Sequence, residues 1–509
     1  MVRWHRKVSL DGDDTDKRPQ HACSHRIPRY RITMDEYLGW YRRRSYAHFD
    51  RPISEAQARA LVTNPKLVSS HAFWPVILNP QKSVSMKEEH GYRVWNTKLR
   101  PIVFAAHSDS HIYAYYAKVL GKFLEDKYSL QGGEHVLAYR RFPRPRCNVH
   151  FALEAFEEIK KKESCEVVAI DVEGFFDSLN HQQLNLAWKQ LLCKDRLPDD
   201  HYAVFKACTQ DTAVTVPTLR DIFGGEIKRR TGISGEAICA PKEFRARVKP
   251  HLRSRHKLVW EVKRKPAPAC LKGLPAGIPQ GLPISAVLAN LYFYDTDLAI
   301  RESIRSLDGS YRRYSDDILL IVPKGQGKAA ELIVQKELKK IQLQVNQEKT
   351  IRCRFGVTNG VLRSISVDRH FKEQNLSSVA YLGFTFDGQH LRVRDSTIAR
   401  FVIKAKRAIE RARIAAVENG EFRLKKRQLY TQLTSLGYGQ AYGNGVYDQT
   451  RGNILPKGAP RLGFFKYLRL AERVTGSAAV CKQIRQIENE VFREIDGAEK
   501  SLGNRPVSA

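Results

Sequence analysis

The chain has 509 residues and a formal net charge of +32, from 86 Lys and Arg against 54 Asp and Glu. Hydrophobic residues make up 42% of it and no stretch is apolar enough to cross a bilayer, so we expect a folded protein of about two to four domains that binds no membrane. The nine cysteines include no Cys-x-x-Cys pair, which argues against a zinc site, and the positive charge spread along the chain predicts a polyanionic partner.

The first 90 residues form a block rich in arginine and aromatic residues, as in IPRYRITMDEYLGWYRRRSY. Such a block is either a surface helix with a solvated basic face or an RNA-binding extension, and both interpretations stay open. The N-terminus has no apolar signal-peptide core, so we expect a cytoplasmic protein. His107 and His111 have the spacing of a metal-binding pair, but without a nearby glutamate we expect packing or polar contacts instead.

Short β-branched segments alternate with helical ones from about residue 91 to 392. The run Glu166–Val172 is almost continuously apolar, as expected of a strand at the centre of a sheet. Asp171 lies at the end of this run. Taken in isolation, it would be interpreted as a helix N-cap. A carboxylate that ends a buried strand needs a partner, however, because an unpaired buried charge is costly. Phe176 follows five residues later, and we expect Phe175 to point to the opposite strand face and into the core.

Residues 195–270 or so have the character of an insertion. The later part, residues 220–265, carries 14 Lys and Arg against 5 Asp and Glu. Charge runs are usually solvated faces, but this one is dense and interleaved with Phe244 and Trp260. We therefore expect it to contact phosphates.

A loop rich in Gly and Pro, GLPAGIPQGLP, precedes a long apolar segment that we expect to be a buried helix. Gly277 and Gly281 let the backbone approach a ligand closely. Gln280 lies between them and presents a planar amide where a nucleotide could lie.

The segment YRRYSDDILLIV is typical of two strands joined by a tight turn, with Asp316 and Asp317 at its tip. Adjacent carboxylates there are either an ordinary turn signal or the ligands of a cation. Asp171 supplies a third carboxylate for a two-metal site, and the carbonyl of Val172 adds a backbone ligand. Further on, Lys349 lies at a strand–loop junction, followed by the short hairpin YLGFTF.

From about residue 393 the chain is basic and helical in pattern. The segment FFKYLRLAERV places an apolar stripe on one helix face, which we interpret as core: Phe464, Tyr467, Leu468, Ala471 and Val474.

These blocks, in this order, resemble those of the reverse transcriptases: the aspartate strand, the Gly-x-Pro-Gln-Gly loop and its helix, the Tyr-x-Asp-Asp hairpin, the Glu-Lys-Thr segment and the Leu-Gly-Phe turn. The resemblance covers about residues 91–392 and implies an α+β right-hand polymerase fold. Fingers and palm, an antiparallel sheet with helices, would occupy 91–392. A helical, nucleic-acid-binding thumb would occupy 393–509, and a basic N-terminal extension 1–90.

The resemblance also implies roles for the site residues. Asp171, Val172, Asp316 and Asp317 would hold two Mg²⁺ ions roughly 3.5–4 Å apart. The three aspartates would be catalytic, and Lys349 would protonate the departing pyrophosphate.

The incoming dNTP would be bound by residues from several motifs. Phe176 would act as a steric gate that excludes a ribose 2′-hydroxyl. The other substrate-binding residues would contact the triphosphate, base or sugar: Lys98, Arg100, Gln280, Gly281 and Tyr314.

The segments HFDRPI, HAFWPVI, CAPKEFR and YRRYSDDIL look like those of bacterial, defence-associated reverse transcriptases. This implies an antiviral role, an RNA template expected to be an associated non-coding RNA, and a DNA product; a homo-oligomer stays open. The alternatives are a retron or group II intron-type enzyme, or a catalytically silent RNA-binding protein on a polymerase fold. The chain departs from the usual Ala, Cys, Val or Met at Ser315, which is small enough to fit.

Overall fold

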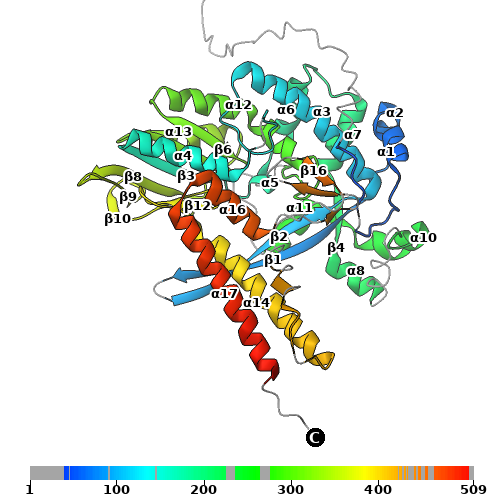
Figure 1. Cartoon of the computed structure of the whole chain (residues 1–509). Coiled ribbons are helices and arrows are strands. Elements are labelled where there is room, and N and C mark those ends of the chain that lie inside the picture. Colours follow the sequence, from blue (N-terminus) through cyan, green and yellow to red (C-terminus); the bar gives the residue numbers. More distant parts are fainter. Residues whose placement is uncertain are drawn as a thin grey trace, which may run out of the picture. The chain divides into compact units, whose positions relative to one another are not determined.

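The computed structural model describes residues 39–503, with gaps at 45, 90–91, 144–145, 225–235, 264–274, 422, 427–428, 431–432, 434–440, 443–444, 449–452 and 457–462. All of the described residues belong to the unit that begins at Leu38 (Figure 1). No helix in the described ranges combines the length and the apolar character needed to cross a membrane.

The central element is a six-stranded antiparallel sheet with the order β10-β9-β8-β3-β7-β6. Its strands are β3 (Cys165–Asp171), β6 (Ser310–Tyr314), β7 (Asp317–Pro323), β8 (Ile351–Thr358), β9 (Val361–Val367) and β10 (Glu373–Leu376). Because β3 lies between β8 and β7, the expectation of a central buried strand is confirmed.

The two faces of β3 contribute to two different hydrophobic cores. Val168 and Ile170 pack with helices α3 (His107–Gln131), α12 (Ser285–Arg305) and α13 (Gly327–Lys340). Cys165 and Val167 pack on the other face with α4 (Asn148–Lys162) and the C-terminal helices. Both faces are covered, so residues 167–170 at the centre of the strand form a continuous apolar run instead of alternating between apolar and polar residues.

The chain turns sharply where it leaves β3. Gly174 adopts a positive φ of 55°, and the short helix α5 (Phe175–Ser178) follows. Phe175 is only 3% exposed, which confirms its place in the core, whereas Phe176 is half-buried. The sequence analysis placed Phe175 and Phe176 on opposite faces of a strand. That explanation is wrong, because both residues lie on a helical turn. Helices α6 (His181–Leu191) and α7 (Asp199–Thr209) complete this region.

A second sheet has the order β2-β1-β4-β5, from β1 (Val76–Glu89), β2 (Tyr92–Phe104), β4 (Thr212–Thr215) and β5 (Arg253–Ser254). Strands β1 and β2 form a long antiparallel hairpin, from the pair Ile77 and Phe104 to the pair Glu89 and Tyr92 (Figure 1). The expected domain boundary at residue 90 falls between these paired strands, which backbone hydrogen bonds join. The division into domains itself stays a prediction.

The basic insertion contributes to this sheet and to a third hydrophobic core. Besides β4 and β5 it forms α8 (Val216–Phe223), α10 (Pro241–Glu243), a π-helical turn (Phe244–Val248), a 3₁₀ turn (Lys249–His251) and α11 (Arg255–Lys263). Phe244 packs against Phe49 and Trp74, with ring centroids 4.8 and 5.2 Å apart. Phe244, one of the two aromatic residues within the basic run, thus packs against this core, and the phosphate contacts expected of the run stay a prediction.

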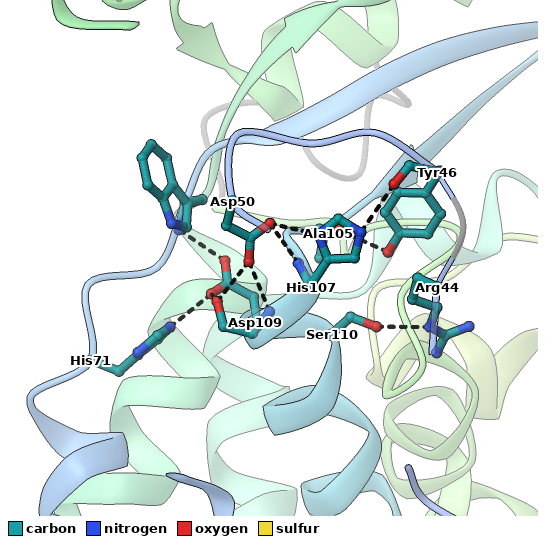
Figure 2. A network of polar contacts seen from close by, with 10 residues as sticks. Arg44, Tyr46, Asp50, His71, Ala105, His107, Asp109 and Ser110 are labelled. Carbon is teal, nitrogen blue, oxygen red and sulfur yellow. Dashed lines mark hydrogen bonds and ion pairs between the residues drawn. The ribbon is translucent and has the colours of Figure 1, made fainter. Parts of the chain in front are cut away.

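Polar contacts attach the segment before β1, which includes α1 (Glu55–Val62) and α2 (Pro65–Ser69), to the start of α3 (Figure 2). His107 Nδ1 lies 2.8 Å from Asp50 Oδ1, and His71 Nε2 lies 2.7 Å from Asp109 Oδ1. His111 stacks on Tyr41 at 4.8 Å, and burial lowers its pKa to about 4. The expected packing and polar roles of the two α3 histidines are confirmed.

The C-terminal part begins with a small sheet, β11 (Val379–Tyr381), β12 (Phe384–Phe386) and β13 (Leu391–Val393). The helices α14 (Asp395–Glu418), α16 (Phe464–Thr475) and α17 (Ala478–Gly503) follow, with short strands β14 (Ala441–Tyr442), β15 (Gly445–Asp448) and β16 (Asn453–Pro456) between α14 and α16. Helices α14 and α17 lie side by side (Figure 1). The apolar stripe of α16 is core as expected, with Phe464, Tyr467, Leu468 and Ala471 buried and Val474 half-buried.

Candidate active site

The three predicted carboxylates come together through the register of the central sheet. Tyr314 pairs with Asp317, so Ser315 and Asp316 form a two-residue turn, in which Ser315 has a φ of 61°. Asp317 in turn pairs with Asp171 at the end of β3, and Val172 donates its backbone N–H to the carbonyl of Asp316 at 3.2 Å. Residues directly opposite each other in an antiparallel pair share a face, so Asp171 and Asp317 present their carboxylates on one side.

A buried ion pair supports this turn from behind. Arg313 and Asp297 are both completely buried, with a guanidinium Nη2 to Oδ2 distance of 2.6 Å. Arg313 Nη1 also donates to the carbonyl of Ser315 at 3.0 Å, which holds the turn in place. Sequence reasoning missed this pair. The available signal was an arginine within a strand and an aspartate within the long, largely apolar helix α12, since buried charges occur in pairs.

The segment after α13 lies along the end of β3. Asn346 donates its backbone N–H to the carbonyl of Asp171 at 2.8 Å, and Val345 forms a bridge with Val172. This places Lys349 in the turn before β8, with its Nζ 2.5 Å from Asp171 Oδ2. The structure therefore brings Lys349 to Asp171, and its catalytic role stays a prediction.

Burial and, after it, crowding of like charges raise the pKa values of two carboxyl groups in the site. Desolvation and the neighbouring charges of Asp316 and Asp171 raise the pKa of Asp317 to about 7, although Lys349 and Arg394 oppose the shift. The Asp317 side chain still reaches water, which screens part of this effect. Desolvation, with a contribution from Asp171, also raises the pKa of Asp316. Arg394, at the start of α14, was not expected from the sequence.

Strand β2 supplies the basic side of the site. Lys98 and Arg100 lie two positions apart and so share one face of the strand. Desolvation, and repulsion from Lys349 and Arg100, lower the pKa of Lys98, whereas Asp171 and Asp316 act in the opposite direction. The interactions of Lys98 with both carboxylates and with Lys349 place it beside the predicted catalytic residues.

The Gly-x-Pro-Gln-Gly loop is attached to β2. Val103 donates its backbone N–H to the carbonyl of Gln280 at 2.8 Å. Gly281 has a φ of 117°, and a Cβ atom there would lie 2.4 Å from the carbonyl oxygen of Val103. The close approach that requires a glycine is thus to the protein's own backbone, and a ligand contact of Gly281 stays a prediction.

The same loop lies against the residues that follow β3. Ile278 donates its backbone N–H to the carbonyl of Phe176 at 2.8 Å, so the predicted sugar gate and the loop are direct neighbours. Gln280 Nε2 donates to Asp177 Oδ2 at 3.2 Å. Tyr314, by contrast, is half-buried with its ring 6.3 Å from that of Phe151, and its substrate contact stays a prediction.

The donor set suits Mg²⁺. Carboxylate and backbone oxygens are the ligands that this ion prefers, and Mg²⁺ is usually held by one or two carboxylates together with substrate phosphates. Mutual repulsion among Asp171, Asp316 and Asp317 is the repulsion that a cation would relieve. Within the described part of the chain, no group of three or more His, Cys, Asp or Glu side chains is arranged so that it could hold a metal ion.

Comparison with known proteins gives a family for part of the chain. Residues 270–386 match the family described as reverse transcriptase (RNA-dependent DNA polymerase). The matched range includes Gln280, Asp316, Asp317 and Lys349, and the sheet register adds Asp171 from outside it. No curated protein matches the chain significantly.

Two solved structures are similar at a low level. Apo telomerase from Candida tropicalis truncated from its C-terminal domain is 12% identical, with a TM-score of 0.34, and covers 62% of this chain. The chain spans about half (55%) of the length of that protein. Apo telomerase from Candida tropicalis is also 12% identical, with a TM-score of 0.35. The alignment covers 91% of this chain and 68% of the telomerase chain.

Residues 270–386 thus match a reverse transcriptase domain, and this match indicates RNA-directed DNA polymerase, a nucleotidyltransferase, for that part of the chain. The expected fold class is confirmed: an α+β right-hand polymerase with an antiparallel palm sheet.

Proposed function

We propose that the whole protein is an RNA-directed DNA polymerase that copies an RNA template into DNA by two-metal phosphoryl transfer. The observation that carries this proposal is the placement of Asp171 opposite Asp317, with Asp316 in the adjoining turn. Lys98 and Lys349 lie beside these carboxylates, so acidic groups for cations and basic groups for phosphates adjoin one another.

Each residue then has a distinct task. When bound, two Mg²⁺ ions would activate the primer hydroxyl and neutralise the triphosphate. Lys98 and Arg100 hold the phosphates from β2 and so position the α-phosphorus for attack. Lys349 contacts Asp171 in the structure and, in this proposal, donates a proton to the departing pyrophosphate.

The choice of sugar rests on Phe176. Its backbone carbonyl is fixed by Ile278, and its ring packs against Phe175 with centroids 5.2 Å apart. A ring held in this way lies under C2′ of the incoming nucleotide and collides with a ribose 2′-hydroxyl. Gln280, on the neighbouring loop, contacts the base and sugar.

Helix α14 offers a surface for the template–product duplex. Four basic residues lie along its exposed face at intervals of about one turn: Arg400, Lys404, Arg407 and Arg411. Ile403, 40% exposed, lies on the same face. Because the face combines cations with apolar contact surface, it suits phosphates and sugars, and it is our candidate for the nucleic-acid track of the thumb.

In the cell we propose an antiviral role in bacteria, with a non-coding RNA as template. The motifs HFDRPI, HAFWPVI and CAPKEFR support this lineage by resemblance. A retron or group II intron-type enzyme is the alternative, and a silent RNA-binding protein is disfavoured because all three carboxylates are present.

Sequencing of the nucleic acids that co-purify with the protein tests the template. We expect one abundant structured RNA together with DNA complementary to it. Random cellular RNA without complementary DNA would contradict the proposal. Phage challenge of cells that carry the wild type or Asp316→Asn tests the defence role, and equal plating on both would refute it.

A further inference from the structure

Asp177, immediately after the predicted sugar gate, is a charged residue in an enclosed place. It is 2% exposed, and its Oδ2 atom accepts hydrogen bonds from two side chains, the ammonium group of Lys263 and Nε2 of Gln280. Lys263 ends helix α11 and Gln280 belongs to the Gly-x-Pro-Gln-Gly loop. A buried carboxylate without partners would be costly, so these three side chains depend on one another.

The carboxylate sets the direction of the Gln280 amide. An ionised carboxylate only accepts hydrogen bonds, so the amide nitrogen must face Asp177. The amide oxygen and the second N–H of Gln280 are then directed to other partners. A neutral amide at position 177 would accept either orientation of Gln280, and the direction would be lost.

Both ends of helix α11 make polar contacts with the residues around Asp177 and with the loop that carries Gln280. Arg255, its first residue, is 1% exposed and pairs with Asp211, with Nε 2.7 Å from each carboxylate oxygen. Its Nη2 atom also donates to the carbonyl of Gly277 at 2.9 Å, where His181 Nε2 makes a second contact at 2.9 Å. Lys263 at the other end contacts Asp177, so the helix from the basic insertion supports the loop that carries Gln280.

We propose that Asp177 is a positioning residue for nucleotide selection, which with Lys263 fixes the amide of Gln280 toward the incoming dNTP. This inference rests on the proposed nucleotide contact of Gln280. It gives the last helix of the basic insertion a role inside the polymerase site, because α11 supplies one arm of the clamp formed by Lys263, Asp177 and Gln280.

A double-mutant cycle tests the clamp on the full-length protein with an RNA template, a DNA primer and single dNTPs. Asp177→Asn, Gln280→Ala and the double variant are compared for kcat and for KM of the dNTP. We expect Asp177→Asn and Gln280→Ala each to raise KM by about tenfold or more, with a smaller change in kcat and unchanged primer–template affinity, as for a lost charge-assisted hydrogen bond. The double variant should be no worse than Gln280→Ala, because Asp177 acts through Gln280.

Two further variants separate positioning from folding. Glu331→Gln removes a buried carboxylate that pairs with Arg352 on the palm at 2.6 Å, and should lower Tm without changing KM. Lys263→Met leaves Asp177 and Gln280 intact and should raise KM in the same direction, while Lys263→Arg restores it; this pair serves if Asp177→Asn does not fold.

Additive effects in the cycle, or an Asp177→Asn enzyme with lower Tm and unchanged KM, would overturn the clamp while leaving the polymerase function in place. A Gln280→Ala enzyme with unchanged KM would overturn both the clamp and the nucleotide contact of Gln280.

Discussion

Asp171 and Asp317 are opposite partners in the antiparallel pairing of β3 with β7, although they are far apart in the chain. Asp316 precedes Asp317 in the turn, and Lys349 contacts Asp171. The sheet register therefore builds the site, because a slip of one residue would move Asp317 to the opposite face.

The raised pKa of Asp317, about 7, predicts an acid limb in the pH profile. As pH falls through this value, the carboxyl group takes up a proton and is lost as an oxygen donor. Because Mg²⁺ competes with the proton, we expect the limb to move to lower pH as Mg²⁺ rises. The measurement is dNTP incorporation against pH at several Mg²⁺ concentrations, and a limb that does not respond to Mg²⁺ would count against the assignment.

The same shift predicts a stability effect in the metal-free protein. The folded-state pKa of Asp317 is raised above the unfolded value of 3.8, so the folded protein binds the extra proton between these values. The Asp317 contribution to stability therefore increases as pH falls from above 7 toward 4. We expect Asp317→Asn to raise Tm at pH 8 and to have less effect at pH 5. Lower Tm at pH 8 would show that repulsion does not govern this residue.

Truncation of the predicted sugar gate should give a gain of activity. Phe176→Ala removes the wall that excludes a 2′-hydroxyl, so ribonucleotide incorporation should rise relative to deoxyribonucleotide by about tenfold or more, since packed sites tolerate extra volume poorly. Competition between one rNTP and its dNTP measures the ratio. Phe175→Ala is the matched control: Phe175 is core, so its loss should cost about 3–5 kcal/mol of stability without changing sugar choice. The reverse result would place the gate at Phe175.

The basic face of α14 should determine the salt dependence of RNA binding. Neutralising Arg400, Lys404, Arg407 and Arg411 together should lower the slope of log K against log salt by about 0.7–0.9 for each lost phosphate contact. Lys406→Gln is the control, since Lys406 pairs with Glu494 of α17 at 2.8 Å. An unchanged slope in the fourfold variant would make this face an ordinary solvated surface. The basic run of the insertion offers no equivalent test, because Lys263 forms an ion pair with Asp177 and because Arg264 and Lys265 lie outside the described residues.

The buried pair behind the turn should contribute strongly to stability. Arg313→Met leaves Asp297 charged, buried and without its guanidinium, which should cost about 3–5 kcal/mol. Adding Asp297→Leu should restore much of this loss, because no unpaired charge then remains. Urea unfolding of both variants measures the difference, and equal stability of Arg313→Met and wild type would contradict the role of the pair.

Much of the palm could be predicted from sequence because its signals are local. The apolar run before Asp171, the strand–turn–strand pattern around Asp316 and the Leu-Gly turn each depend on nearby residues. The β1–β2 pairing across residue 90, the ion pair of Arg313 with Asp297 and the contact of Lys263 with Asp177 are different. These contacts depend on which distant segments of the chain meet, and no local sequence pattern contains that information. Charged residues that the sequence suggests are solvated therefore turn out to be buried in ion pairs.

The most direct test of the account is primer extension on an RNA template with dNTPs and Mg²⁺, comparing wild type with Asp171→Asn and Asp316→Asn. We predict template-dependent DNA synthesis by the wild type and a loss of more than about a thousandfold in each variant, since residues of one catalytic unit fail together. RNA affinity and Tm should stay close to wild type. Near-normal DNA synthesis by Asp316→Asn, with folding intact, would contradict the central claim that these carboxylates form the polymerase site.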